Sequence, residues 1–313
     1  MIGSTNAVIV SGGSSPYPVF GYTGDYQMID DGDGNWRIKF LTSGNLSFWE
    51  SPGSCDVFLV GGGGSGAFRS LLGDSPNENY GSGGGGGGYT ATHSSLALSS
   101  GTIYPIVIGS GGNAVSTTGS TAFGNDGSAT SAFGYSANGG KGGGVDTAEY
   151  LYQPYRGGNG GSGGGGGDRR YANDTDYMGG SNGGNGYDSS TTAYGIGQGT
   201  TTREFGENDG DLYAGGGGAG VFVKSNAYDS YDPPVSYDNN GGSGGGGNGC
   251  LTYAYSSEYW PILETEPSDG TTNSGGGGGG GLKARDVPNG EITEYPSGAG
   301  GSGIVILRNH RGA

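Results

Sequence analysis

The stretch RGGNGGSGGGGGDRR, Arg156–Arg170, decides the fold. Nine of the eleven residues between Arg156 and Asp168 are glycine, and the other two are Asn159 and Ser162. Without apolar side chains, such a stretch cannot form an amphipathic helix or a strand with a packed face. It is therefore either a flexible linker or an ordered backbone from which side chains are excluded.

Runs of the same kind recur along the chain, and most of them are six to eleven residues long. Nearly all of their interruptions are Ser, Asn or Ala. A random linker has no reason to repeat its length in this way, so the recurrence favours an ordered structure. The clearest runs are Gly61–Gly66, Gly81–Gly88, Gly139–Gly144, Gly157–Gly167, Gly179–Gly186, Gly215–Gly220, Gly241–Gly249, Gly275–Gly281 and Gly298–Gly303.

The composition leaves disorder as the alternative interpretation. Glycine accounts for 80 of the 313 residues, against a usual fraction of about 7%. It does not recur strictly at every third position, which excludes a collagen triple helix. Only 31% of the residues are hydrophobic, too few for a conventional core of this size. Most glycine-rich, low-complexity chains with so little apolar content are disordered.

Glycine runs can form a solid body if they adopt the extended polyglycine II helix, which has three residues per turn and no internal hydrogen bonds. Its amides point outward in three directions and need partners on neighbouring helices. Ordering the backbone costs about 1–2 kcal/mol per residue, whereas a hydrogen bond returns about 0.5–1.5 kcal/mol. A lattice of such helices therefore needs packed strands to anchor it.

Short segments rich in β-branched and aromatic residues provide candidate anchors. One of them leads directly into the first long glycine run, and another follows the last run directly. Hairpin turns are expected at Asp30–Asn35 and Ser43–Asn45. The predicted strands are Trp36–Thr42, Leu46–Trp49, Asp56–Val60, Thr102–Gly109 and Gly303–Arg308.

These features together predict the fold class and the domain boundaries of the chain. No 3.6-residue periodicity extends beyond about two turns, so almost no α-helix is expected. The predicted fold is mainly β and irregular, with a small β-sheet element and a bundle of packed polyglycine II helices joined by loops. Residues 1–35 are predicted to be an N-terminal lead or attachment segment, and residues 36–313 a glycine-rich domain framed by β-strands.

The charge of the chain limits its partners. The formal net charge is −16, and the 13 Lys and Arg residues are scattered. A nucleic acid requires a basic patch, so no nucleic acid is expected as a partner. No stretch approaches 18 apolar residues, and the first residues do not resemble a Sec-type signal. Membrane insertion is therefore not expected, and synthesis in a cytoplasm is.

Neither the cysteines nor the aspartate-rich turn indicates a metal or a cofactor. Cys55 and Cys250 are too far apart in sequence for a zinc motif or a disulfide framework, and whether they pair is left open. The sequence DDGDGN, Asp30–Asn35, resembles the start of a calcium loop. However, Trp36 occupies the position where such a loop requires glycine, so a plain turn is favoured.

The remaining polar residues do not form a catalytic motif. Glu204 and Glu207, in TREFGE, are interpreted as part of an ordinary solvated turn. The two histidines, His93 and His310, are distant in sequence, and no motif supports a Ser–His–Asp site around them. We therefore expect no enzymatic activity, no catalytic residues, no metal and no cofactor.

Six segments together carry a family resemblance: LTSGNLSFWESPGSCDVFLVGGGGSG (41–66), GGGGGGYT (83–90), YPIVIGSGG (104–112), TTTREFGE (200–207), LYAGGGG (212–218) and GGSGIVILR (300–308). In combination they resemble the glycine-rich domain proteins of tailed phages and of their prophages in Gram-positive gut bacteria, over roughly Trp36–Arg308. A more distant resemblance is to phage tail-fibre adhesins in which a sandwich of polyglycine II helices presents loops to the bacterial surface. The resemblance implies a host-recognition adhesin at a tail or fibre tip.

The segments between the glycine runs are rich in Tyr, Ser, Asp and Asn. Tyrosine offers a large amphipathic contact area at a small rotamer cost, and the short polar residues add adaptable hydrogen bonds, as in antibody paratopes. The alternative for any single tyrosine is that it covers and shields the lattice. The predicted receptor-binding residues are Tyr150, Tyr152, Tyr155, Tyr171, Tyr177, Tyr228, Tyr231, Tyr237, Tyr253, Tyr255, Tyr259 and Trp260.

The sequence thus predicts a non-enzymatic adhesin that acts outside the cell, as part of a virion at a tail or fibre tip. Its expected partners are a bacterial cell-surface glycan or protein and other tail or fibre subunits, with a homo-oligomer left open. The alternative is a structural protein whose unpaired edge amides drive assembly into filaments or a surface layer. Which end of the lattice would face a host is not evident from the sequence.

Overall fold

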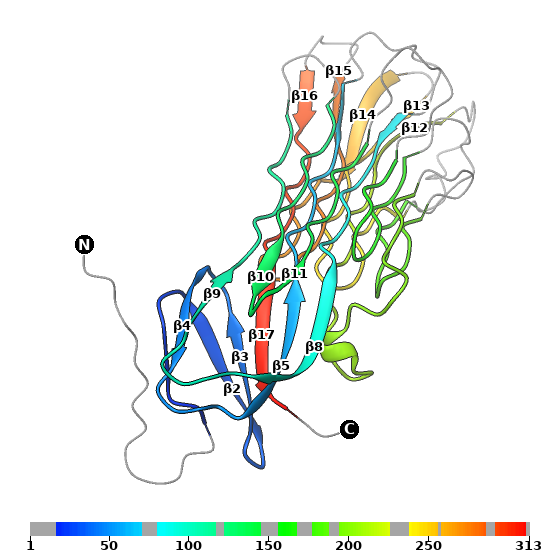
Figure 1. Ribbon diagram of the computed structural model, residues 1–313. Helices are drawn as coiled ribbons and strands as arrows, with labels where there is room; N and C mark the ends of the chain where they lie inside the picture. The colour runs from blue at the N-terminus through cyan, green and yellow to red at the C-terminus, as the bar shows by residue number, and fades with distance from the viewer. Residues whose placement is uncertain are drawn as a thin grey trace, which may run out of the picture.

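The computed structural model describes residues 17–70, 80–116, 122–144, 156–167, 177–187, 194–225, 238–255, 258–285 and 292–310. A β-sandwich forms one end of the molecule, and a long bundle of glycine-rich segments extends from it (Figure 1). In the described part of the chain the only helical element is a single 3₁₀ turn, η1 (Glu204–Gly206). The prediction of a mainly β and irregular fold with almost no α-helix is therefore confirmed.

The sandwich consists of two five-stranded sheets in which all neighbouring strands are antiparallel. The β9 sheet has the order β1 (Phe20–Tyr22), β4 (Gly44–Phe48), β9 (Ile103–Val107), β10 (Thr130–Ala132) and β11 (Tyr135–Ala137). The β17 sheet has the order β2 (Tyr26–Gly32), β3 (Asn35–Phe40), β17 (Ile304–Asn309), β5 (Ser54–Val60) and β8 (Thr90–Ala97). The five strands predicted from the sequence correspond to β3, β4, β5, β9 and β17.

Strand β17 is buried on both faces, which explains its continuous apolar sequence IVIL. Val305 and Leu307 point into the core between the two sheets. Ile304 and Ile306 point to the opposite face, where they pack with Phe58 and other buried residues. A buried side chain of this size contributes roughly 1.5–3 kcal/mol, so the sandwich is the anchor that the glycine bundle requires.

The predicted hairpin turn at Asp30–Asn35 is confirmed. Strands β2 and β3 pair across Asp33 and Gly34, whose φ angles are 53° and 80°. Two consecutive positive φ angles are typical of a type I′ turn, which suits the twist of the adjoining strands. Strand β1 pairs with β4, and strand β2 pairs with β3. The predicted boundary between residues 35 and 36 therefore does not separate two folded units. It divides a hairpin, and residues 20–32 belong to the sandwich.

The predicted hairpin turn at Ser43–Asn45 is also wrong. Strands β3 and β4 belong to different sheets, so the chain crosses from one sheet to the other at this point. The crossing is tight: a Cβ added to Gly44 would lie 2.7 Å from the backbone nitrogen of Gly24. The glycine therefore serves a close approach of two backbones, and a hydrogen bond from the Tyr22 hydroxyl to the Thr42 carbonyl closes the crossing.

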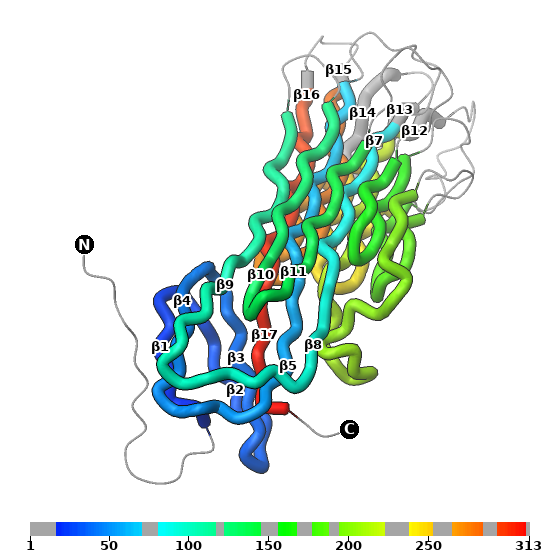
Figure 2. The backbone as a smooth tube through the Cα atoms, in the orientation of Figure 1, coloured from blue at the N-terminus to red at the C-terminus, as the bar shows by residue number. Residues whose placement is uncertain are grey.

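The glycine-rich segments lie side by side along the bundle (Figure 2), and their hydrogen bonds repeat every three residues. In segment 61–67, the amides of residues 61, 64 and 67 donate to residues 89, 86 and 83. The amides of residues 62 and 65 donate to residues 128 and 125, and those of residues 63 and 66 to residues 301 and 298. Every third amide thus meets the same neighbour, as a helix with three residues per turn requires.

The carbonyls of segment 61–67 bond to three further neighbours. Residues 62 and 65 accept from residues 140 and 143, residue 63 accepts from residue 112, and residues 64 and 67 accept from residues 278 and 281. The segment is therefore surrounded on all sides by hydrogen-bonded backbone. Segment 83–88 is enclosed in the same way, by donors and acceptors in 64–67, 141–144, 158–165, 217 and 275–278. The predicted lattice of packed polyglycine II helices is the arrangement observed.

Side chains are excluded where these helices touch. A Cβ added to Gly85 would lie 2.1 Å from the carbonyl oxygen of Gly64, far inside the 3.5–4.0 Å or so at which non-bonded carbon atoms attract. Non-glycine residues occur where the side chain has a partner or free space. The buried Ser65 hydroxyl, for example, accepts a hydrogen bond from the Asn125 amide.

Two smaller sheets lie at the end of the bundle away from the sandwich (Figure 1). One has the order β14 (Glu258–Thr265), β13 (Leu251–Tyr255), β12 (Gly220–Ser225) and β7 (Tyr80–Ser82). The other has the order β16 (Ile292–Tyr295), β15 (Gly281–Arg285) and β6 (Phe68–Ser70). The lattice is therefore framed by paired strands at both ends, although the five strands predicted from the sequence all lie in the sandwich. We call this second end the distal end.

Candidate functional site

The distal end is the first candidate site, because the tyrosine-rich connections of the sequence join the lattice there. The described residues that flank these connections bond to one another across the end of the bundle, which brings the attachment points of many connections together. The backbone pairs are Phe68 with Ala122, Ser82 with Gly220, Gly144 with Arg156, Gly166 with Tyr187, and Tyr177 with Asp238.

Most of the predicted receptor-binding residues lie outside the described residues. This applies to Tyr150, Tyr152, Tyr155, Tyr171, Tyr228, Tyr231 and Tyr237. Tyr253 and Tyr255 are in β13, and Tyr259 and Trp260 in β14, so these four residues belong to one antiparallel strand pair at the distal end. The position of this strand pair at the distal end is compatible with the predicted role of these residues in receptor binding.

Tyr177 has a different environment from a surface contact residue. Its exposed fraction is 3%, and it packs in a small core with Ala219, Val221 and Leu251. Its amide donates to Asp238, and its carbonyl accepts from Ala219. Tyr177 therefore corresponds to the alternative in which a tyrosine covers the lattice, and it offers almost no surface to a partner.

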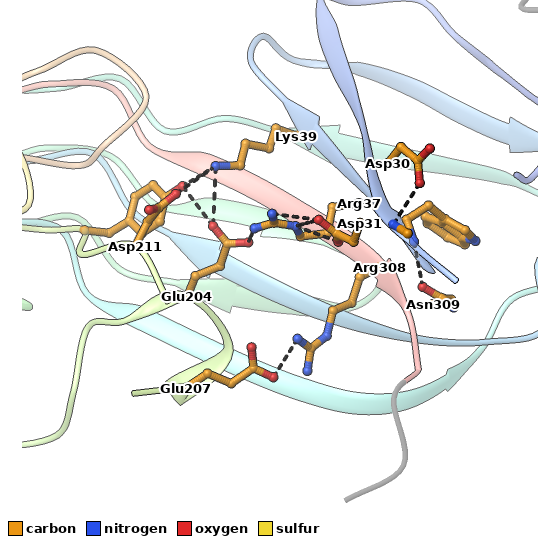
Figure 3. Close-up of polar contacts among 12 residues, drawn as sticks. Asp30, Asp31, Arg37, Lys39, Glu204, Glu207, Asp211, Arg308 and Asn309 are labelled. Atoms are coloured by element: carbon orange, nitrogen blue, oxygen red, sulfur yellow. Dashed lines mark hydrogen bonds and ion pairs between the residues drawn. The ribbon is translucent and has the colours of Figure 1, made fainter. Parts of the chain in front are cut away.

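A second polar cluster lies at the sandwich, on the face of the β17 sheet that points away from the sandwich core (Figure 3). Glu204, which is 2% exposed, pairs with Arg37 at 2.5 Å and with Lys39 at 3.4 Å. Arg37 also binds the Asp31 carboxylate through two nitrogens, at 2.9 Å each. These contacts bind the segment around η1 to β3.

Tyr213 and the apolar residues around η1 complete this attachment. The Lys39 ammonium donates to the Tyr213 hydroxyl at 3.0 Å. Burial, together with the nearby Glu204 charge, raises the pKa of Tyr213 to about 12, even though the bond from Lys39 acts in the opposite direction. The Tyr213 ring packs on Phe58 of β5. The η1 segment thus fixes the glycine lattice to the sandwich.

The interpretation of Glu204 and Glu207 as a solvated turn is therefore wrong for Glu204, and both residues form ion pairs. Arg37 and Lys39 alternate along one strand and so share the face opposite the core residues Trp36, Ile38 and Phe40. Two basic residues on the same face of a predicted strand indicate that acidic side chains cover this face.

Asp56, in β5, is the centre of a third cluster, beside the edge strand β8 of the same sheet. Its carboxylate is buried and accepts from Arg308 Nε at 3.2 Å, from the Ser95 amide at 3.1 Å and from His310 Nδ1 at 2.6 Å. Burial alone would raise the pKa of Asp56, but the hydrogen bonds from His310, Ser95 and Arg308 lower it below its ordinary value. Arg308 also pairs with Glu207 at 2.7 Å.

One cavity opens beside this cluster, with a volume of about 670 Å³. It lies between the end of β8, strand β9 and the β10–β11 hairpin, and its lining is made of aromatic, aliphatic and small polar side chains. The lining residues are Ser95, Leu96, Ala97, Leu98, Tyr104, Pro105, Ser131, Ala132, Phe133, Gly134, Tyr135 and Ser136.

Among the described residues, no group of three or more His, Cys, Asp or Glu side chains could hold a metal ion. In the aspartate-rich turn, Asp31 binds Arg37 and Asp30 accepts from the Gly32 amide, so these carboxylates support the hairpin. Cys55 and Cys250 are buried free thiols. Burial, with a contribution from the Asp56 charge, raises the pKa of Cys55 to about 12, which makes its thiol unreactive.

A comparison with protein-family models matches residues 42–310 to a glycine-rich domain. The match covers most of the chain. The chain belongs to the glycine-rich domain family. A comparison with curated proteins finds no match.

The glycine-rich domain match begins after β3, so strands β1 to β3 precede it. These strands nevertheless supply five of the seventeen buried residues of the sandwich core: Phe20, Tyr22, Trp36, Ile38 and Phe40. In this glycine-rich domain protein the folded unit therefore extends beyond the matched residues. A search of the described residues finds no helix that is long and apolar enough to cross a membrane.

Proposed function

We propose that this glycine-rich domain protein is a receptor-binding adhesin of a phage tail or fibre tip, without enzymatic function in recognition. It would act outside the cell, in a virion, on a glycan or protein of a bacterial cell surface. The observation that carries this proposal is that the described residues which flank the tyrosine-rich connections, such as Gly144 and Arg156, meet at the distal end of the lattice, opposite the sandwich.

Rigidity matters because binding loops gain affinity when their ends are already ordered. In the distal end, each connection starts and finishes in backbone that is hydrogen-bonded to its neighbours. Gly144 donates to Arg156 across the base of the connection 145–155, and Gly83 donates to Gly144. Such a support resembles a rigid scaffold that carries variable binding loops.

The chemistry of the connections suits a surface glycan or an exposed protein segment. The connection 145–155, VDTAEYLYQPY, combines three tyrosines with Glu149 and Asp146. Aromatic faces can stack on the apolar side of a sugar ring, and carboxylates can accept bonds from its hydroxyls. The sandwich at the other end would be the part that other tail or fibre subunits hold.

Binding to cells tests this proposal. We expect the variant with Tyr150, Tyr152 and Tyr155 all replaced by alanine to bind host cells at least tenfold more weakly, because a contact tyrosine contributes more than about 1 kcal/mol. The measurement is flow cytometry of fluorescently labelled protein on a panel of Gram-positive gut bacteria. The unfolding midpoint should be unchanged.

The matched control is Trp49→Ala, which removes an aromatic residue that is 52% exposed but lies in the sandwich. This variant should bind like the parent chain. If the parent chain binds no strain of the panel but sediments as fibres that grow with concentration, the filament alternative replaces the adhesin. Equal binding by the triple variant and the parent would remove 145–155 from the contact surface.

A further inference from the structure

Ser95, His310 and Asp56 are arranged as a nucleophile, a base and an orienting carboxylate. The Ser95 hydroxyl lies 3.5 Å from His310 Nε2, and His310 Nδ1 lies 2.6 Å from Asp56 Oδ1. The carboxylate therefore holds the proton on Nδ1 and leaves Nε2 free to accept from the hydroxyl. Acyl transfer requires this assignment of the ring nitrogens. The 3.5 Å between the hydroxyl and Nε2 is longer than a typical hydrogen bond, as is common when no substrate is bound.

The backbone exposes this serine. Between Cys55 and Val57 the pairing of β5 with β8 shifts by one residue, so that Ser94 and Ser95 both lie opposite Asp56 in a β-bulge. Ser95 has a φ of 60°, a left-handed conformation that is unfavourable for a residue with a side chain. Strained residues and bulges are concentrated at functional sites.

Ser95 is also one of the residues that line the cavity of about 670 Å³ at the end of β8. The lining contains Tyr104, Phe133 and Tyr135 but no Asp, Glu, Lys, Arg or His side chain. The lining residues Phe133 and Gly134, with φ angles of 55° and 82°, form the turn between β10 and β11. A cavity of this size and composition suits a neutral ligand with an apolar or ring-shaped body.

We propose that Ser95, His310 and Asp56 form a hydrolytic site for neutral acyl esters. Ser95 Oγ attacks the ester carbonyl while His310 Nε2 takes the hydroxyl proton. The alcohol leaves with that proton, and the acyl group remains on Ser95. Water, deprotonated by His310, then releases the carboxylic acid and regenerates the hydroxyl. The site is separate from the distal end, so this activity is independent of the proposed adhesion.

Covalent labelling of the intact chain tests the proposal. We expect a fluorophosphonate probe to label a single serine, identified as Ser95 by peptide mass spectrometry. Hydrolysis of p-nitrophenyl acetate should fall at least about 100-fold in Ser95→Ala and in His310→Gln, the scale of a lost nucleophile or general base. Ser94→Ala, which changes the adjacent exposed serine, should label and hydrolyse like the parent chain.

Two readouts keep the result interpretable. Circular dichroism should be the same in all variants, and the unfolding midpoints of Ser95→Ala and Ser94→Ala should match that of the parent chain, because both serines lie at the surface. Failure of the probe to modify Ser95, or equal hydrolysis by Ser95→Ala and the parent, would overturn the proposal.

Discussion

Replacing Gly164 by alanine should lower the free energy of unfolding by at least about 3 kcal/mol, since it breaks more than one buried hydrogen bond and leaves the partners unpaired. A Cβ at this position would lie 2.2 Å from the carbonyl oxygen of Gly84. That carbonyl accepts from Gly158 at 2.8 Å, and the Gly84 amide donates to Gly165 at 3.0 Å. The added methyl group therefore separates two helices of the lattice.

The matched control is Gly21→Ala in strand β1. A Cβ on Gly21 would make only ordinary contacts, at 3.8 Å to Ser47 and to Trp49. The free energy of unfolding of this variant should lie within about 1 kcal/mol of that of the parent chain. Alanine restricts the unfolded chain more than glycine does, which is mildly stabilising where alanine can adopt the native backbone conformation. Guanidinium unfolding of both variants measures the difference. Equal stability of Gly164→Ala and Gly21→Ala would show that the glycines do not form a close-packed lattice.

The second large effect is expected at Arg308, where methionine keeps the apolar length of the side chain but removes its charge. Arg308→Met should cost about 3 kcal/mol, the lower range for breaking a buried ion pair. The change leaves the buried Asp56 carboxylate without this guanidinium, and it removes the pair with Glu207. The guanidinium also stacks on the Phe205 ring, at 3.9 Å from its centroid.

Lys141→Met provides the control for this experiment. Lys141 pairs with Asp126 at 2.7 Å, a shorter distance than that between Arg308 and Asp56, but both side chains are more than half exposed. An exposed pair contributes only about 0–1 kcal/mol, so this variant should unfold nearly like the parent chain. If Arg308→Met and Lys141→Met have the same midpoint in guanidinium, η1 is not held by the buried charges.

The lattice could be predicted from the sequence because its cause is local. Glycine is required wherever a Cβ would meet a neighbouring carbonyl, and runs such as Gly81–Gly88 report this requirement directly. The central strands β5 and β17 were equally predictable, since their sequences VFLV and IVIL are apolar at every position. Strand β8, Thr90–Ala97, was missed because it lies at a sheet edge and is mostly exposed and polar.

Long-range pairing could not be predicted. Nothing near Ser43 indicates that β3 and β4 separate into different sheets, because that choice is made by the partners β17 and β9. The burial of Glu204 depends on Arg37, which is distant in sequence. Ser95 and His310 meet only because the last strand of the chain pairs beside β5. The tyrosine pattern predicted the connections, but it could not separate Tyr177, a core residue, from its neighbours.

The most direct measurement is residue-resolved amide exchange of the glycines in 61–67 and 83–88, by NMR of the intact protein. The lattice predicts that every consecutive amide is protected as strongly as Val305 in β17, because each one donates to a neighbour on one of three sides. An edge strand would protect alternate residues. Exchange of consecutive glycines at the rate of an unstructured peptide would contradict the lattice and the rigid support of the distal end.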